Sequence, residues 1–174
     1  MTVVVRLGAE QLLARADELA ALLVDAVDGG ASVGFLAPLD PAEARAWWQA
    51  RAAGPYTVWG ALDGGRIVGT VTLAFPDKPN SRHRAELVKL IVHGDARGRG
   101  LGRRLLTTAE EAAAAADLTL LHLDTETDSP AERLYRSAGW TRAGVIPDYA
   151  ADPGGVLRGT TLYYKHLGPA APAG

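Results

Sequence analysis

Glycine and arginine alternate in one short segment of the chain, Arg97-Gly98-Arg99-Gly100-Leu101-Gly102-Arg103. An apolar run of Leu, Ile and Val precedes this segment, and a helical pattern with Leu101, Leu105 and Ala109 on one side follows it. The first N–H groups of a helix have no partner within the helix, and the helix dipole adds partial positive charge there. Glycines let the backbone approach an anion, and arginines supply charge-assisted donors. The segment therefore predicts a site for a phosphate-bearing cofactor.

The elements that would position this segment follow from hydrophobic periodicity and from turn residues. We expect strands over Thr2–Leu7, Tyr56–Leu62, Arg66–Phe75, Ala85–Val92, Leu118–Thr125, Trp140–Ile146 and Thr160–His166. We expect helices over Ala9–Val27, Pro41–Ala53 and Gly100–Ala116, and a short helix between Ser129 and Gly139. Because a helix separates Ala85–Val92 from Leu118–Thr125, these two strands are expected to lie parallel.

Composition limits the classes of protein. Of the 174 residues, 48% are hydrophobic and 22% are charged, and no apolar run reaches the length that spans a membrane. A formal net charge of -2 argues against nucleic acid or an anionic membrane as the main partner. The chain has no cysteine and no histidine pair at metal-ligand spacing, so a metal site is not expected. We expect a cytoplasmic protein with one domain over residues 1–168 and a disordered tail over residues 169–174.

Two adjacent tryptophans, Trp47 and Trp48, lie in the predicted helix Pro41–Ala53. Adjacent helix positions point about 100° apart, so both rings cannot face the same part of the core. One interpretation is a core tryptophan beside a partly exposed one. The other interpretation is that one of them, Trp47, forms a wall of a substrate pocket.

Two motifs together resemble the GNAT superfamily of N-acetyltransferases. Arg97 to Gly102 fits its Arg/Gln-x-x-Gly-x-Gly/Ala signature, after a strand end and before an amphipathic helix. Ala131 to Trp140 is similar to its second signature, Ala-x-x-Leu-Tyr-x-x-x-Gly-Phe, with Trp in place of Phe. Two motifs in the right order, about thirty residues apart and each in the expected strand and helix context, are more specific than either alone. The resemblance covers nearly the whole chain.

The resemblance implies an α/β (α+β) fold of the GNAT type. This fold has a mixed, mostly antiparallel twisted sheet of about seven strands, flanked by about four helices. Its central parallel pair would be splayed apart at a site for acetyl-CoA. Backbone groups of the strand end would pair with the pantetheine arm of acetyl-CoA, and the glycine and arginine segment would hold the pyrophosphate. The cofactor-binding residues implied in this way are Leu90, Ile91, Val92, Arg97, Gly98, Arg99, Gly100, Leu101, Gly102, Arg103 and Asp128, the last standing where many members carry Asn.

Tyr135 lies in the second motif and is our candidate for the general acid. Acetyl transfer to an amine leaves a thiolate that benefits from a nearby acid. A phenol has an ordinary pKa a little above that of a thiol, which is a reasonable match for this role. The alternative is a tyrosine that packs its ring against the sheet and bonds its hydroxyl locally.

Glu86 is our candidate for the general base, because the amine must lose a proton before it attacks. It stands eleven residues before Arg97, the offset at which histone acetyltransferases of the superfamily carry their catalytic glutamate. A carboxylate within an otherwise apolar strand is costly unless it is solvated or paired. The alternative is a carboxylate at the strand start that faces solvent or pairs with Arg84.

The other candidate bases are His83, Asp124 and Glu126, and a water chain could also carry the proton. Together with Glu86, these residues would give an acidic lining that suits a cationic amine. The segments His83–Glu86 and Leu121–Glu126 and the region of Tyr149 also resemble the tabtoxin-resistance branch of the superfamily, which acetylates an amino-acid toxin. The candidate substrate-binding residues are therefore Trp47, His83, Asp124, Glu126 and Tyr149.

The resemblance predicts an acetyl-CoA-dependent N-acetyltransferase. It would acetylate a primary amine of a small molecule, with an amino-acid-like toxin or antibiotic as one candidate, by direct attack in a ternary complex. The alternatives are a protein or peptide N-acetyltransferase and a non-catalytic sensor that binds acyl-CoA. Nucleic acid and membranes are not expected as partners. A homodimer stays open, since the late strands are commonly used for that in this superfamily.

Overall fold

The computed structural model describes residues 1–168, so the tail predicted over residues 169–174 lies outside the described residues. The strands are β1 (Thr2–Leu7), β2 (Tyr56–Asp63), β3 (Arg66–Ala74), β4 (Arg84–Val92), β5 (Leu120–Glu126), β6 (Thr141–Ala151) and β7 (Leu157–His166). The α-helices are α1 (Ala9–Ala14), α2 (Ala16–Asp28), α3 (Pro41–Arg51), α4 (Leu101–Ala115) and α5 (Pro130–Ser137), with short 3₁₀ helices η1 (Pro79–Ser81) and η2 (Gly94–Ala96).

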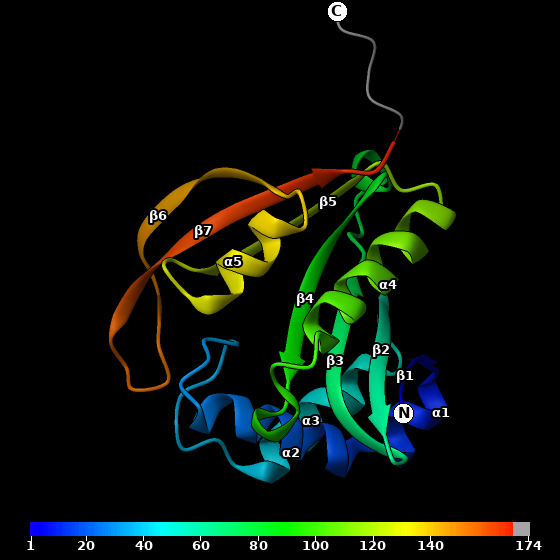
Figure 1. Ribbon diagram of the computed structural model, residues 1–174, viewed down its shortest axis with the longest axis vertical. Coiled ribbons are helices and arrows are strands. Elements are labelled where there is room, and N and C mark those ends of the chain that lie inside the picture. Colours follow the sequence, from blue (N-terminus) through cyan, green and yellow to red (C-terminus); the bar gives the residue numbers. More distant parts are fainter. Residues whose placement is uncertain (169–174) are drawn as a thin grey trace, which may run out of the picture.

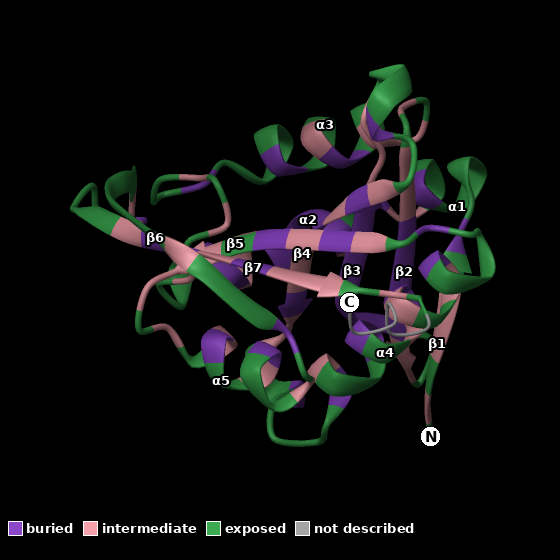
Figure 2. Ribbon diagram, turned by 90° about the horizontal axis from the view of Figure 1, so that it is seen from above, coloured by how far each residue is buried: buried purple, intermediate pink, exposed green. Residues whose placement is uncertain are grey.

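The strands form one sheet in the order β1-β2-β3-β4-β5-β7-β6 (Figure 1). Neighbouring strands are antiparallel except β4 and β5, which are parallel. The helices cover both faces, with α1, α2 and α3 on one side and α4 and α5 on the other (Figure 2). The predicted mixed sheet with a central parallel pair is confirmed.

Each face of the sheet has its own hydrophobic core. On one face, leucines of α4 such as Leu105 and Leu106 pack against β3, β4 and β5, and Tyr135 of α5 joins them. On the other face, Leu19 and Leu23 of α2 pack with Trp48 of α3 against the sheet. Adjacent residues of β2 and β3, such as Val58 and Trp59 or Ile67 and Val68, therefore belong to different cores.

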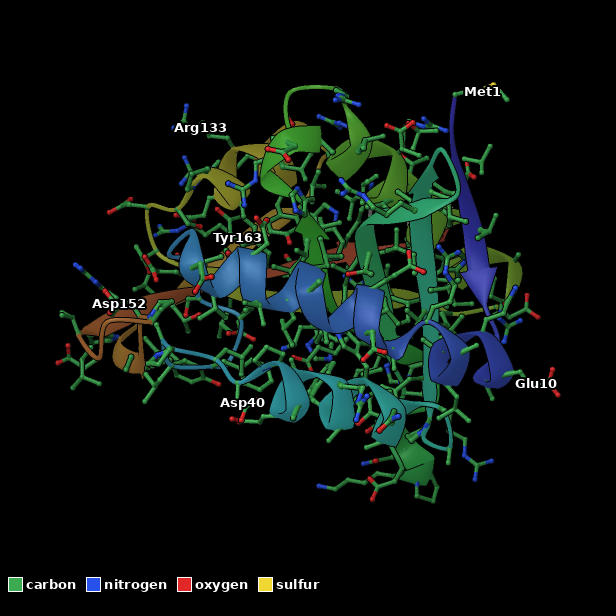
Figure 3. All side chains as sticks on the ribbon, turned by 90° about the horizontal axis from the view of Figure 1, so that it is seen from below. Met1, Glu10, Asp40, Arg133, Asp152 and Tyr163 are labelled. Atoms are coloured by element: carbon green, nitrogen blue, oxygen red, sulfur yellow. The ribbon has the colours of Figure 1, made fainter. Side chains whose placement is uncertain are left out.

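Helix α3 begins where the proline predicts. Pro41 occupies the first turn, and Asp40 lies at the start of the helix (Figure 3). The side chain of Asp40 accepts a hydrogen bond of 2.8 Å from the N–H of Ala42. The first predicted helix, by contrast, is two helices that meet at Arg15, so the chain has five α-helices within residues 1–168 instead of about four. The guanidinium of Arg15 pairs with Glu18 at 2.7 Å and also donates to the carbonyl of Gly65 in the β2–β3 turn. This contact between distant parts of the sequence stabilises the break between α1 and α2.

The parallel pair separates soon after it begins. Only Arg84, Ala85 and Glu86 of β4 are paired with β5, opposite Leu120 to His122. Lys89 then adopts a positive φ of 52°, and the register with β3 shifts between Thr70 and Thr72. This bulge bends β4 away from β5 (Figure 1). The β5-facing backbone edge of β4 beyond Glu86 therefore has no strand partner among the described residues.

Strands β6 and β7 are longer than the sequence pattern predicts and form a hairpin that extends beyond the rest of the sheet (Figure 1). Asp152 shapes its turn, because its carboxylate accepts from the N–H of Val156 and pairs with Arg158, both at 3.0 Å. The carbonyl of Pro153 accepts a 2.9 Å hydrogen bond from the N–H of Ala37, which lies in the connection between α2 and α3. Among the helices of residues 1–168, none is long and apolar enough to cross a membrane.

Candidate active site

The turn between β4 and α4 presents an uncapped helix N-terminus. Gly98 and Gly100 have positive φ values of 75° and 72°, a conformation that costs other residues about 1–2 kcal/mol. Gly100 is the N-cap of α4, and within residues 1–168 no side chain bonds the first N–H groups of this helix. These N–H groups and the helix dipole suit an anion. A Cβ added at Gly98 or Gly100 would meet nothing within 4 Å, so the backbone conformation requires glycine there.

The arginines of this turn are exposed and are anchored in different directions. Arg97 donates from Nε to the carbonyl of Val92 at 3.1 Å. Arg99 pairs with Asp63 in the β2–β3 turn at 3.1 Å, which neutralises part of its charge. Arg103 donates to the carbonyl of Ser137 at 3.2 Å and also bonds its hydroxyl. Arg103 therefore spans the gap between the first turn of α4 and the end of α5.

Asp25 of α2 holds this turn from the other side, and the sequence motifs did not reveal it. Its carboxylate accepts a 3.0 Å hydrogen bond from the N–H of Gly94 and lies 3.6 Å from Nε2 of His93. Helix α2, on the opposite face of the sheet from α4, thus fixes the point at which β4 ends and η2 begins. Leu101, also assigned to the cofactor from sequence, is 3% exposed, so it offers its backbone and not its side chain.

Leu90, Ile91 and Val92 form the last part of the unpaired edge of β4. Ile91 is buried in the core under α2, whereas Leu90 and Val92 pack against the core under α4. The opposite edge of this segment pairs with Gly69 and Thr70 of β3. The free backbone groups of β4 need partners, and an extended chain lying along the edge can supply them.

Tyr135 of α5 points its ring into the core below the separated strands. Its ring lies 5.8 Å from that of Trp140 and 6.0 Å from that of Tyr163, and the residue is 6% exposed. Its hydroxyl makes no hydrogen bond within residues 1–168, unlike the locally bonded tyrosine that the sequence left as the alternative. Burial raises the pKa of Tyr135, and the negative charge of Asp124 raises it further. The phenol therefore keeps its proton.

A buried carboxylate supports the helix that carries Tyr135. Glu132 is 2% exposed and accepts a 2.6 Å hydrogen bond from the hydroxyl of Tyr163. The N–H of Asp128, which has a positive φ of 63°, bonds its other oxygen. Burial raises the pKa of Glu132, but the bonds from Tyr163 and from the Asp128 backbone outweigh it and hold this pKa below its ordinary value. Asp128 thus contributes its backbone to the start of α5.

Glu86, His122, Asp124 and Glu126 lie on one face of the parallel pair. Leu121 and Leu123 belong to the core under α4, so the residues that alternate with them on β5 face the other side. Register places Glu86 beside His122. The guanidinium of Arg84 bonds Nε2 of His122 at 2.8 Å, and the other Arg84 contact goes to Ser81, so Arg84 does not pair with Glu86.

His122 serves as a neutral hydrogen-bond acceptor in this row. Arginine can only donate, so Nε2 of His122 accepts the bond from Arg84. Burial lowers the pKa of His122. The charge of Glu86 raises this pKa by less, and the still smaller effects of Arg84 and Asp124 lower and raise it in turn. The described residues contain no group of three or more histidine, aspartate or glutamate side chains that could hold a metal ion.

A narrow pocket of about 40 Å³ lies at the end of β5. Its walls include Asp124, Glu126, Tyr149 and Ser32, so three of the five candidate substrate residues meet there. Arg158 also lines it, but its charge is paired with Asp152 at 3.0 Å. Asp124 accepts a 3.1 Å hydrogen bond from the hydroxyl of Thr160, whereas Oε2 of Glu126 is buried without a partner among the described residues. We call this the acidic pocket.

His83 is not brought to the acidic pocket. It is exposed before the start of β4, and its carbonyl accepts a 2.9 Å bond from the N–H of Thr119, which precedes β5. The parallel strands run from this end toward the pocket, so the length of β5 separates His83 from Glu126.

Trp47 and Trp48 divide as the first interpretation predicts. Trp48 is fully buried in the core under α2, and Trp47 is half-buried. The guanidinium of Arg51 stacks on the Trp47 ring at 3.5 Å. The ammonium of Lys89 lies 4.9 Å from the centre of the same ring and 5.9 Å from that of Phe35. Sequence reasoning missed Lys89, although a lysine within an apolar strand is a signal that could have found it.

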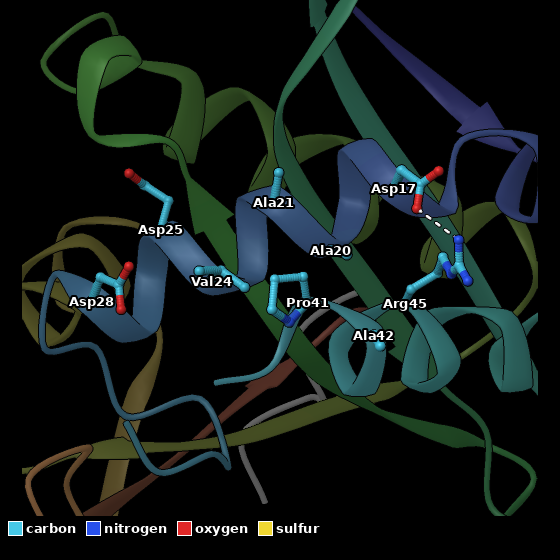
Figure 4. A pocket seen from close by; sticks show the side chains of 9 residues that line it. All are labelled: Asp17, Ala20, Ala21, Val24, Asp25, Asp28, Pro41, Ala42 and Arg45. Carbon is cyan, nitrogen blue, oxygen red and sulfur yellow. Dashed lines mark hydrogen bonds and ion pairs between the residues drawn. The ribbon is translucent and has the colours of Figure 1, made fainter. Parts of the chain in front are cut away.

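A larger hollow of about 610 Å³ lies between α2 and α3, away from these residues (Figure 4). Asp17, Asp25 and Asp28 of α2 line it, and Asp17 pairs with Arg45 of α3 at 3.2 Å. None of the predicted catalytic, cofactor or substrate residues contributes to its walls. We therefore assign the chemistry to the separated strands and not to this hollow.

Comparison with known proteins gives the class to which this fold and site belong. A sequence profile described as the Acetyltransferase (GNAT) family matches residues 13–140. The chain belongs to this family. It is therefore an acyltransferase, and its acetyl donor is acetyl-CoA.

Solved structures share the fold over nearly the whole chain. An N-acetyltransferase from Staphylococcus aureus Mu50 has a TM-score of 0.81 at 18% identity, covering 97% of this chain and 99% of that one. A Salmonella typhimurium structure determined with its cofactor acetyl-CoA has a TM-score of 0.80 at 21% identity, covering 100% and 98%. The ribosomal-protein-alanine N-acetyltransferase from Brucella melitensis has a TM-score of 0.76 at 25% identity, covering 95% and 99%.

The charge of Lys89 gives a prediction about stability. Burial lowers the pKa of Lys89 from its ordinary 10.5, Arg51 lowers it further, and Asp124 and Glu86 raise it by less. The folded state thus binds this proton less tightly than the unfolded chain, which destabilises the fold wherever both states are charged. This penalty fades as pH rises from the lowered pKa to 10.5. We expect Lys89→Met to raise the free energy of unfolding at pH 7, measured by urea titration, and the gain to shrink toward pH 10.5.

The exposed Lys78 provides the control, and Lys78→Met is expected to change the free energy of unfolding by less than about 0.5 kcal/mol. A Lys89→Met variant that is less stable than the parent at neutral pH would show instead that the ammonium contributes to folding.

Proposed function

We propose that this acetyltransferase transfers the acetyl group of acetyl-CoA to a primary amine of a small molecule, by direct attack in a ternary complex. The observation that carries the proposal is the acidic pocket, in which Asp124 and the unpartnered Oε2 of Glu126 lie at the end of β5. Carboxylates in a narrow site favour a cationic amine. Glu86 stands on the same face of the sheet, closer to the point at which the strands separate.

The chain offers groups that fit acetyl-CoA on the other side of this point. The unpaired edge of β4 at Leu90, Ile91 and Val92 would bond an extended pantetheine arm. The uncapped start of α4 at Gly100, with Gly98, Gly102, Arg97, Arg99 and Arg103 around it, would hold the pyrophosphate. When bound, acetyl-CoA supplies an acetyl group activated as a thioester. The backbone N–H of Asp128 is already bonded to Glu132, so Asp128 has the least structural support among the candidate cofactor-binding residues.

Glu86 is our proposal for the group that accepts the proton of the amine. Its side chain makes no hydrogen bond or ion pair within residues 1–168, so its oxygens are free to accept one. Arg84, the partner that would have occupied it, bonds His122 and Ser81 instead. The carboxylate of Asp124 accepts a hydrogen bond from the Thr160 hydroxyl, which fixes its position. Asp124 is therefore suited to orient the ammonium group of the acceptor.

Tyr135 is our proposal for the group that donates a proton to the thiolate. Its pKa is raised by burial, so the phenol is fully protonated at neutral pH and its hydroxyl has no competing partner in residues 1–168. Glu132 and Tyr163 fix α5 from below and hold the ring in place. A raised pKa weakens the phenol as an acid, so the role of Tyr135 rests on its position and on its free hydroxyl, which can donate a hydrogen bond to the developing thiolate.

A small acceptor is favoured over a peptide by the way the pocket is closed. Ser32 of the α2–α3 connection and Tyr149 of the β6–β7 hairpin both line the acidic pocket. The hydrogen bond from Ala37 to Pro153 joins the same two segments at 2.9 Å. A peptide would need an open groove here, whereas a free amino acid, toxin or antibiotic needs only a short entry.

The second candidate function is acetylation of a protein or peptide amine. One observation favours it, since the Brucella melitensis protein with 25% identity is a ribosomal-protein-alanine N-acetyltransferase. A peptide acceptor would require the contact between Ala37 and Pro153 to open. A non-catalytic acyl-CoA sensor is disfavoured by the presence of both Glu86 and Tyr135. A panel of small amines and of peptides with free amino termini, assayed by release of the free thiol, separates these functions.

The cofactor assignment predicts a difference between two adjacent arginines. Arg103 faces the gap between α4 and α5, whereas Arg104 donates to the carbonyl of Thr2 at the opposite edge of the sheet. Acetyl-CoA is expected to raise the melting temperature of the parent protein by mass action. Arg103→Gln should weaken binding by about tenfold, the lower end for a hydrogen bond to a charged group, and Arg104→Gln should leave it unchanged, as measured by calorimetry. Absence of any thermal shift in the parent would contradict the assignment.

The proton-transfer roles predict large losses of turnover on whichever acceptor the panel identifies. Glu86→Gln and Tyr135→Phe are each expected to lower kcat by about 100-fold or more, because each removes a positioned proton-transfer group. Tyr164→Phe on β7 and Glu111→Gln on α4 are the matched controls and should retain parental kcat. Unchanged turnover in Glu86→Gln would assign the base to Asp124, Glu126 or a water chain, and unchanged turnover in Tyr135→Phe would exclude the acid role.

A further inference from the structure

Lys89 carries a half-buried ammonium group with no anionic partner. Within residues 1–168, its Nζ makes neither a hydrogen bond nor an ion pair. The centres of the Trp47 and Phe35 rings lie 4.9 Å and 5.9 Å from Nζ. A cation–π contact recovers about 0.5–2 kcal/mol, which does not replace the hydrogen bonds that an ammonium makes in water. Nζ is not one of the fully buried atoms that lack a partner, so its donors reach water in the free protein and are open to a ligand.

The backbone directs this side chain to the acceptor side of the sheet. Lys89 occupies the bulge of β4 at a positive φ of 52°, which interrupts the alternation of the strand. Its Nζ reaches the α2–α3 connection, because a Cβ added at Gly34 would lie 3.7 Å from it. Ser32 of the same connection lines the acidic pocket. Lys89 and the acidic pocket therefore belong to one surface, on the face opposite α4.

Charge of both signs is present on this surface but is not internally paired. The Glu86 and Asp124 carboxylates lie close enough to act on Lys89 through their charge, yet neither is within 4.0 Å of its Nζ. Arg51 also stacks on the Trp47 ring and adds a second positive charge near Lys89. Separated opposite charges suit a ligand that carries both signs a short distance apart.

We propose that Lys89 binds a carboxylate of the acceptor, so that the acceptor is an amino acid or a close derivative with an amine and a carboxylate in one small molecule. The ammonium of Lys89 and the rings of Trp47 and Phe35 form the anion subsite, and Asp124 and Glu126 form the amine subsite. For the amine subsite, this inference rests on the proposed function. The pyrophosphate of acetyl-CoA is assigned elsewhere, to the start of α4, so it does not account for Lys89.

The first test compares matched acceptors by turnover. The probes are L-amino acids and straight-chain ω-amino acids, each beside its own carboxamide, with release of the free thiol as the readout. The parent protein should prefer the carboxylate form. Lys89→Met should raise KM for the carboxylate form by about 10- to 100-fold, the range for a hydrogen bond between charged groups, and leave the carboxamide unchanged. Lys89→Arg should keep most of the preference, and the exposed Lys78→Met should match the parent.

The second test measures binding and needs no turnover. N-acetylated amino acids and their carboxamides are titrated by calorimetry into the parent and Lys89→Met proteins, each saturated with coenzyme A. The parent should bind the carboxylate form more tightly, and Lys89→Met should lose this difference. If small amines are not acetylated but this difference is present, the proposed function fails and the role of Lys89 stands.

Three results would overturn the role of Lys89. The first is a parent protein that shows no preference for the carboxylate form in either test. The second is a Lys89→Met variant that keeps the preference. The third is stoichiometric acetylation of Lys89 itself in the parent, seen by mass spectrometry after incubation with acetyl-CoA, since an acetylated lysine has no charge to offer.

Discussion

The structure depends on the separation of β4 from β5 just after Glu86. Three residues of parallel pairing hold the two halves of the sheet together, and the bulge at Lys89 then turns β4 away. A buried strand edge without partners is costly, so a protein retains one only where another chain or ligand completes it. The same separation places the start of α4 at the end of the free edge and leaves Tyr135 of α5 under the gap. The separation of β4 from β5 thus determines where the acetyl-CoA site, Tyr135 and the acidic pocket lie.

The site also contains polar groups that lower the stability of the folded protein. Lys89 holds a charge that burial disfavours, Oε2 of Glu126 is buried without a partner, and Glu86 is left unpaired in a strand. Other buried polar groups are satisfied, as in the pairing of Glu132 with Tyr163 and the Asp128 backbone, although Nε1 of Trp48, Nε of Arg51 and Oγ1 of Thr72 are also buried without a partner within residues 1–168. The charged groups among the unsatisfied ones, on Lys89, Glu86 and Glu126, lie near the separated strands, as is typical of a binding site.

Local signals predicted the parts of the fold that depend on neighbouring residues. The glycines at 98 and 100, the proline at 41 and the apolar run of β4 each fix local backbone geometry, and each element formed where the pattern indicated. Features set by long-range contacts were missed. The break at Arg15 depends on Gly65, the turn after β4 depends on Asp25, and the setting of Lys89 depends on Trp47. The roles of Tyr135 and Glu86, and the resemblance to the tabtoxin-resistance branch, stay predictions.

Hydrogen exchange with and without coenzyme A tests most directly whether the separated strands form the donor site. The amides of β4 beyond Glu86 and of the turn from Arg97 to Arg103 have no strand or capping partners on the relevant side, so they should exchange readily in the free protein. The account predicts that coenzyme A slows exchange in both segments and leaves β1 and β2 unchanged. Protection confined to the hollow between α2 and α3, or exchange in β4 that coenzyme A does not alter, would contradict it.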